Sequence, residues 1–152
     1  MGQQQLLLVI LVTIIVGIAT VVAINTFSSA ADSANIDSVR NDMISIAASA
    51  QSHYLKPVML GGGGRTFNGL GFQDLAFPSN GISADSTSAE NENGLYVLAV
   101  AGDGQSVTIT ASPASADGYV PGTITAGVLT VGTAATTPLT GTIQPDGYVP
   151  TN

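Results

Sequence analysis

The sequence predicts an α+β fold in which a long N-terminal helix packs against a small antiparallel β-sheet head domain. Three observations predict it. Residues 6–24 are almost entirely aliphatic, apolar residues then recur at helical spacing up to Tyr54, and strand-like alternation follows from Gly94. We therefore expect a membrane or filament-core helix over residues 1–24, its amphipathic continuation over 25–56, a Gly-rich loop region over 57–93, and a β-rich head over 94–152.

The first segment is long and apolar enough to cross a bilayer. Residues 6–24 carry no charge, and only Thr13, Gly17 and Thr20 interrupt the aliphatic side chains. A bilayer core of about 30 Å needs roughly 20 apolar residues in a helix. A secretory signal peptide is an alternative, but its apolar region is usually about 7–15 residues and follows basic residues. Here the first Lys or Arg is Arg40, although small residues after Ala23 leave cleavage open.

The helical pattern continues beyond this segment. Residues 26–55 contain neither Pro nor Gly, and Pro57 disfavours helical geometry at Lys56. We expect one helix from about residue 3 to 55, continuous or broken once near residues 17–25, where Gly and Thr weaken helix propensity. Steps of three and four place one apolar stripe on this helix as the face that packs on the sheet: Ile36, Val39, Met43, Ile46, Ala47, Ala50 and Tyr54.

The C-terminal half shows strand and turn patterns. Residues 95–101 and 105–111 form a predicted hairpin around Gly102-Asp103-Gly104, and residues 123–126, 128–133 and 139–143 are further strands. Gly127 is either a bulge or a tight turn. Aromatic and leucine side chains should hold the preceding loop to the head or to a neighbouring subunit: Phe67, Leu70, Phe72, Leu75 and Phe77.

Composition argues against several function classes. The chain has no cysteine, and three basic against ten acidic residues give a net charge of −7, so a nucleic-acid surface is not expected. We find no nucleophile–base set, metal cluster or cofactor motif, and predict a protein that is not an enzyme. His53 has no partner at ligand spacing and is interpreted as structural. Asp-Gly-Tyr-Val-Pro occurs at residues 117–121 and 146–150, and we expect turns that place Tyr119 and Tyr148 in contacts between heads or against a loop.

The architecture of the whole chain resembles the type IV pilin family, and the specific match lies in residues 1–55. The resemblance is carried by Gly2, the polar stub of residues 3–5, the apolar run, the amphipathic continuation and the four glycines at 61–64. It departs at position 5, where bacterial pilins usually carry Glu and this chain has Gln. The resemblance implies Gly2 as a candidate processing residue and a filament core built from these side chains: Gln3, Gln4, Gln5, Leu6, Leu7, Leu8, Val9, Ile10, Leu11, Val12, Ile14, Ile15, Val16, Gly17, Ile18, Val21, Val22 and Ile24.

The same resemblance implies the major structural subunit of an extracellular helical filament at the cell surface. Its membrane-inserted precursor would wait in the inner membrane, be extracted by pilus assembly machinery, and bundle its apolar helix with those of identical copies. The neutral amides at residues 3–5 of adjacent subunits would hydrogen-bond to each other or to exposed helix-terminal N–H groups. The Met1 amine would be modified, reach water in a lumen or meet backbone carbonyls. The alternatives are a pseudopilin or minor pilin of a secretion or uptake system, a single-pass membrane-anchored surface-binding domain, and a secreted β-domain with a signal peptide.

Overall fold

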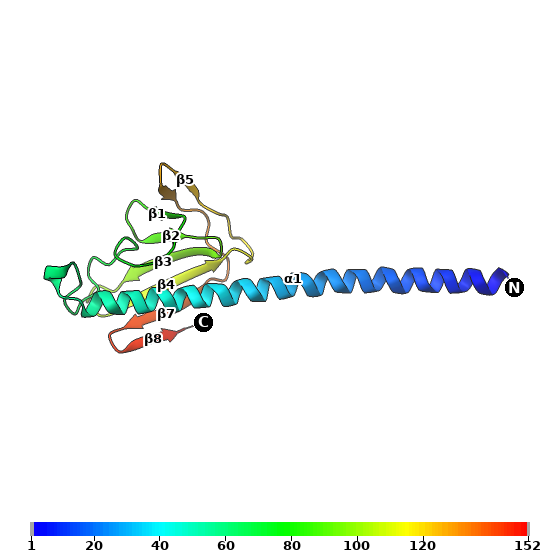
Figure 1. Ribbon diagram of the computed structural model, residues 1–152, viewed down its shortest axis with the longest axis horizontal. Coiled ribbons are helices and arrows are strands. Elements are labelled where there is room, and N and C mark those ends of the chain that lie inside the picture. Colours follow the sequence, from blue (N-terminus) through cyan, green and yellow to red (C-terminus); the bar gives the residue numbers. More distant parts are fainter. Residues whose placement is uncertain (1, 152) are drawn as a thin grey trace. The chain divides into compact units, whose positions relative to one another are not determined.

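A computed structural model describes residues 2–151 (Figure 1). One helix, α1 (Gly2–Leu55), precedes a short 3-10 helix, η1 (Val58–Leu60). The predicted helix over residues 3–55 is confirmed, and it has no break. Pro57 ends it by adopting an extended conformation with φ −60° and ψ 148°. The chain forms two compact units, Met1–Ala34 and Asn35–Asn152.

The second unit holds a single eight-stranded sheet. Its order is β5-β6-β1-β2-β3-β4-β7-β8. The strands are β1 (Gly81–Ser83), β2 (Ser88–Glu90), β3 (Gly94–Val100), β4 (Val107–Pro113), β5 (Thr123–Thr125), β6 (Val128–Thr130), β7 (Leu139–Gln144) and β8 (Gly147–Pro150). Six of the neighbouring pairs are antiparallel, whereas β1 pairs with β6 in parallel.

The α+β class is confirmed, but the prediction of a small, purely antiparallel sheet is wrong. Both β1 and β2 lie inside the segment that we expected to be a loop, residues 57–93. Each strand has three residues, most of them small or polar, so neither shows the alternation that predicts a strand. The parallel pairing of Ile82 with Val128 joins segments far apart in the chain, and local patterns do not predict such contacts.

Two turns follow from residues with positive φ. Between β5 and β6, Ala126 and Gly127 have φ values of 53° and 81°, and Thr125 pairs with Val128. This is a two-residue hairpin turn with positive φ at both central positions, so Gly127 belongs to a tight turn and not to a bulge. In the β3–β4 connection, Gly104 has φ 66° and its N–H bonds to the carbonyl of Ala101.

The core of the second unit lies between α1 and one face of the sheet. Residues 35–55 of α1 run across the strands in Figure 1, between β4 and β7. Five stripe residues are fully buried there: Val39, Met43, Ile46, Ala47 and Ala50. Ile36 and Tyr54 are half-buried, and Tyr54 packs against the core. The sheet contributes alternate side chains such as Tyr96 and Leu98 of β3, Val107 and Ile109 of β4, and Ile143 of β7.

The segment before β1 also belongs to this core. Phe67, Leu70, Phe72, Leu75 and Phe77 are all buried. Phe72, Phe77 and Tyr96 form a chain of tilted and edge-on ring contacts with centroids 5.7 and 5.1 Å apart. These side chains therefore hold the segment to its own head, which was one of the two arrangements expected.

Candidate assembly site

Residues 6–24 of the first unit present a long apolar surface that only Thr13, Gly17 and Thr20 interrupt. Every described residue up to Ala34 is exposed. Between Leu6 and Ile24 the large aliphatic side chains keep from 47% (Ile10) to 67% (Leu7) of their surface accessible. At about 25 cal/mol per Å², such exposure to water is strongly unfavourable. This surface therefore needs an apolar environment that the chain itself does not supply.

The polar groups within the segment are already satisfied by the helix. The Thr13 hydroxyl donates to the Ile10 carbonyl at 2.8 Å, and the Thr20 hydroxyl donates to the Val16 carbonyl at 2.8 Å. An unpaired hydroxyl would be costly in lipid or in a helix bundle. With these bonds made, the segment can enter either environment without leaving its threonine donors unpaired.

Among the described residues, α1 is the one helix long and apolar enough to cross a membrane. The mean hydropathy of its most apolar 18-residue window is 3.2, and none of that window is buried. The core helix of a soluble protein can match in composition, but it would be covered by its own chain. A signal sequence near the N-terminus meets the same length and composition criteria.

The polar stub precedes this surface. Gln3, Gln4 and Gln5 are exposed on the first turns of α1, and the first acidic residue of the chain is Asp32. Each amide offers donors and an acceptor to a neighbour. The expectation for the amine of Met1 concerns a residue that lies outside those the structure describes.

A polar cluster that the sequence did not reveal joins α1 to β3 within the second unit. One carboxylate oxygen of Asp42 accepts hydrogen bonds from Asn91 Nδ2 at 2.9 Å, Asn93 Nδ2 at 2.8 Å and the Tyr96 hydroxyl at 2.6 Å. Asn91 and Asn93 lie in the turn between β2 and β3. The cluster therefore fixes the position of the amphipathic half of α1 on the sheet.

The cluster shifts two pKa values in opposite directions. Burial alone would raise the pKa of Asp42, but the hydrogen bonds from Asn93, Tyr96 and Asn91 together hold it below the usual 3.8. Burial, and then the hydrogen bond to Asp42, raise the pKa of Tyr96 well above its ordinary value. Both shifts favour an Asp42 carboxylate paired with a neutral Tyr96 phenol.

The two tyrosines of the repeat make different contacts. The Tyr119 hydroxyl donates to Glu90, a buried carboxylate that also accepts the Gly122 N–H at 2.9 Å. Tyr148 in β8 packs against the core, and its hydroxyl lies 3.9 Å from the Met43 sulfur. Neither ring stands free, so both tyrosines stabilise their own head. Contact with another head stays a prediction.

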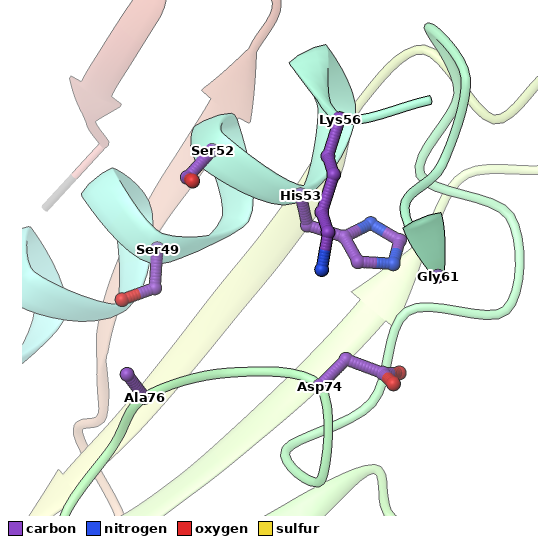
Figure 2. A pocket seen from close by; sticks show the side chains of 7 residues that line it. All are labelled: Ser49, Ser52, His53, Lys56, Gly61, Asp74 and Ala76. Carbon is purple, nitrogen blue, oxygen red and sulfur yellow. The ribbon is translucent and has the colours of Figure 1, made fainter. Parts of the chain in front are cut away.

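His53 lines a pocket of about 310 Å³ at the end of α1 (Figure 2). Ser49, Ser52, Lys56 and Asp74 are among its other lining residues. Nδ1 of His53 is buried without a hydrogen-bond partner, while Asp74 accepts the Gly71 N–H at 3.2 Å and so closes its own turn. No hydrogen bond joins His53 to Asp74 in the described residues, and no group of three metal-binding side chains occurs there. The pocket therefore shows no acid–base pair or metal centre.

Comparison of this chain with protein-family models, with curated proteins and with solved structures gives no match. The features of this chain that indicate a function are the exposed apolar surface of α1 and the head to which the same helix contributes its second half.

Proposed function

We propose that this protein is a structural subunit of an extracellular helical filament of the type IV pilus class. The observation that carries the proposal is the exposed, uncharged surface of residues 6–24, none of which the chain buries itself. A helix that is apolar on every side is stable in lipid or within a bundle of similar helices. Both environments occur in succession when a membrane-held subunit is extracted into a fibre.

The second half of α1 supports the same proposal. The apolar stripe of this half is buried in the core of the head. Removal of the second half of α1 would therefore destroy the packing of the head. A single helix thus serves assembly with its first half and folding with its second. Copies bundled through residues 6–24 would carry their heads on the outside of the fibre.

The energetics imply a role for assembly machinery. Transfer of the apolar segment from lipid to a helix bundle gains little from the hydrophobic effect, because lipid tails are equally apolar. The gain is in side-chain packing against identical neighbours. Extraction from the membrane should therefore need an external energy source, and the inner membrane and an assembly complex are the partners that we propose.

Microscopy of sheared cell-surface material tests the proposal. Cells that express the full chain should release filaments composed mainly of it. A chain that lacks residues 1–24 should give a soluble head without filaments. Filaments assembled by the truncated chain would mean that contacts between heads hold the polymer, which would contradict the proposed core.

Three alternatives predict other outcomes. A pseudopilin or minor pilin would be a small fraction of sheared fibres, whereas a major subunit would dominate them. A single-pass anchored domain would stay in the membrane fraction as single copies, and the internally bonded hydroxyls of Thr13 and Thr20 suit that state too. Mass spectrometry of the N-terminus identifies a cleaved signal peptide.

A further inference from the structure

The tip of the head carries an exposed apolar projection. After α1 ends, the consecutive side chains of Val58, Met59 and Leu60 in η1 are 70%, 97% and 67% exposed. Leu55, one turn earlier, is exposed as well. This projection, residues 58–60, appears in green at the left of Figure 1, beyond the C-terminal end of α1. Four large apolar residues at one exposed point indicate a contact surface.

The glycine run that follows holds this projection in a fixed place. The N–H groups of Gly62, Gly63 and Gly64 bond to the carbonyls of Pro57, His53 and Lys56 at 3.2, 2.8 and 3.0 Å. A Cβ at Gly62 would overlap the carbonyl oxygen of Lys56, so the close return of the chain requires glycine there. The projection is therefore part of an ordered loop that packs back on the helix end.

Two basic residues flank the projection, and one acidic residue, Asp74, lines the pocket next to it together with Lys56 and Gly61. Lys56 and Arg65 flank the projection and are exposed, and they are two of the three basic residues in a chain of net charge −7. The backbone N–H of Arg65 bonds to the Tyr54 carbonyl at 2.8 Å, which keeps it beside the helix end. The tip thus combines an apolar centre with two exposed flanking cations.

A cavity of complementary character lies elsewhere on the same head. It has a volume of about 410 Å³, and Tyr119, Pro121 and Ile124 form apolar parts of its wall. Glu90 and Glu92 also line it, and Glu92 is exposed. We call this the acidic socket. An apolar wall with carboxylates matches an apolar projection flanked by cations.

The projection and the acidic socket lie at opposite ends of the head. Asn35, where the second unit begins, donates to the Asn93 carbonyl at 3.1 Å and accepts the Ser115 hydroxyl at 3.0 Å, next to socket residues Glu92 and Ala114. The projection follows Leu55, and 20 residues of helix separate the two ends by about 30 Å. One head therefore cannot fill its own socket with its own projection.

We infer that the projection of one copy docks in the acidic socket of a second copy of this chain. Met59 enters beside Ile124, and Lys56 and Arg65 face Glu92. The contact uses two different surfaces, so it is heterologous and repeats from copy to copy as an open stack of heads. It deepens the filament proposal by naming a contact between heads, and it rests on that proposal only in assuming that copies pack together.

Cysteine cross-linking of the full chain in cells tests the inference, because the natural sequence has no cysteine. Met59→Cys with Ile124→Cys in one chain should give a ladder of disulfide-linked oligomers under mild oxidant. Met59 is 97% exposed and Ile124 is 44% exposed, so neither substitution removes a core side chain and the head should stay folded. Co-expression of the two single variants should stop at dimers. The matched control, Ile44→Cys with Ile124→Cys, uses another exposed apolar residue and should give no ladder.

Charge variants and microscopy separate the two proposals. Lys56→Glu with Arg65→Glu should reduce the ladder at least severalfold, and adding Glu92→Lys should restore part of it.

Filaments without the ladder would overturn the docking inference and leave the filament proposal standing. A ladder without filaments would support docking and contradict the filament. Absence of both would overturn both, and dimers from Met59→Cys alone would replace docking with a tip-to-tip contact.

Discussion

The two halves of α1 show how one helix can satisfy two different burial requirements. Residues 6–24 are apolar on every side and exposed, whereas residues 35–55 are apolar along one stripe and buried along that stripe only. A stripe can be covered by one sheet of the same chain, but a fully apolar surface needs neighbours all around. The width of the apolar surface therefore distinguishes the half that folds the head from the half that requires other molecules.

The largest expected effect on membrane insertion and assembly comes from placing a charge in the first half. Ile15→Lys should lower membrane insertion, because a lysine at the centre of a spanning helix costs about 2.5–3.5 kcal/mol. This corresponds to roughly 60- to 300-fold in an equilibrium constant. Membrane fractionation and filament yield measure it, and the head should still melt as in the natural chain. Ile44→Lys, on the exposed side of the second half, is the matched control and should change neither. Normal filaments from Ile15→Lys would show that the apolar surface of the first half is not needed for assembly.

The next prediction concerns the stability of the head, which depends on the second half of α1. Ile46 is fully buried in the head, so Ile46→Ala should lower the free energy of unfolding by about 2–5 kcal/mol. Its neighbour Ile44 is 55% exposed, and Ile44→Ala should cost less than about 0.5 kcal/mol. Denaturant unfolding in detergent measures both, while membrane insertion should be unchanged. Equal costs for the two would show that the stripe is not the packing face.

Periodicity predicted this contrast, and it could do so because both signals are local. Steps of three and four placed Val39, Met43 and Ile46 on one face without knowledge of the sheet. The Asp42 cluster lacked such a signal, because Asn91, Asn93 and Tyr96 come about 50 residues later. The sequence did not predict the short strands β1 and β2 either, because they are strands through their pairing with other segments and not through their composition. The acidic socket likewise exists only after β2, β5 and the connection between β4 and β5 come together.

The Asp42 cluster should make the stability of the head depend on pH. The pKa of Asp42 in the folded head is lower than its ordinary value of 3.8. Asp42 therefore stabilises the fold at pH values above 3.8, and this stabilisation is lost as the pH falls through the folded-state pKa. Asp42→Asn should cost about 1–2 kcal/mol at neutral pH. Below about pH 4 the difference from the natural chain should shrink. Asp37→Asn is the control, since Asp37 is exposed and pairs with Arg40 at 3.2 Å. Identical pH profiles of stability for Asp42→Asn and the natural chain would show that the cluster does not stabilise the head.

The smallest effects concern the two copies of the repeat. Tyr119→Phe removes a donor from buried Glu90 and should cost about 1 kcal/mol. Tyr148→Phe loses only a long contact to the Met43 sulfur and should cost less than about 0.5 kcal/mol. Urea midpoints of the two variants compare them directly. The reverse order of costs would mean that β8 depends on the Tyr148 hydroxyl more than its geometry indicates.

Electron cryomicroscopy of filaments sheared from cells that express this chain tests whether residues 6–24 form the filament core. We expect a central bundle in which residues 6–24 of each copy are surrounded by the same residues of neighbours. Gln3 to Gln5 should meet amides or helix-end N–H groups of adjacent copies, and the heads should lie outside. A fibre whose centre lacks these helices, or a chain found only as single copies in the membrane, would contradict this expectation.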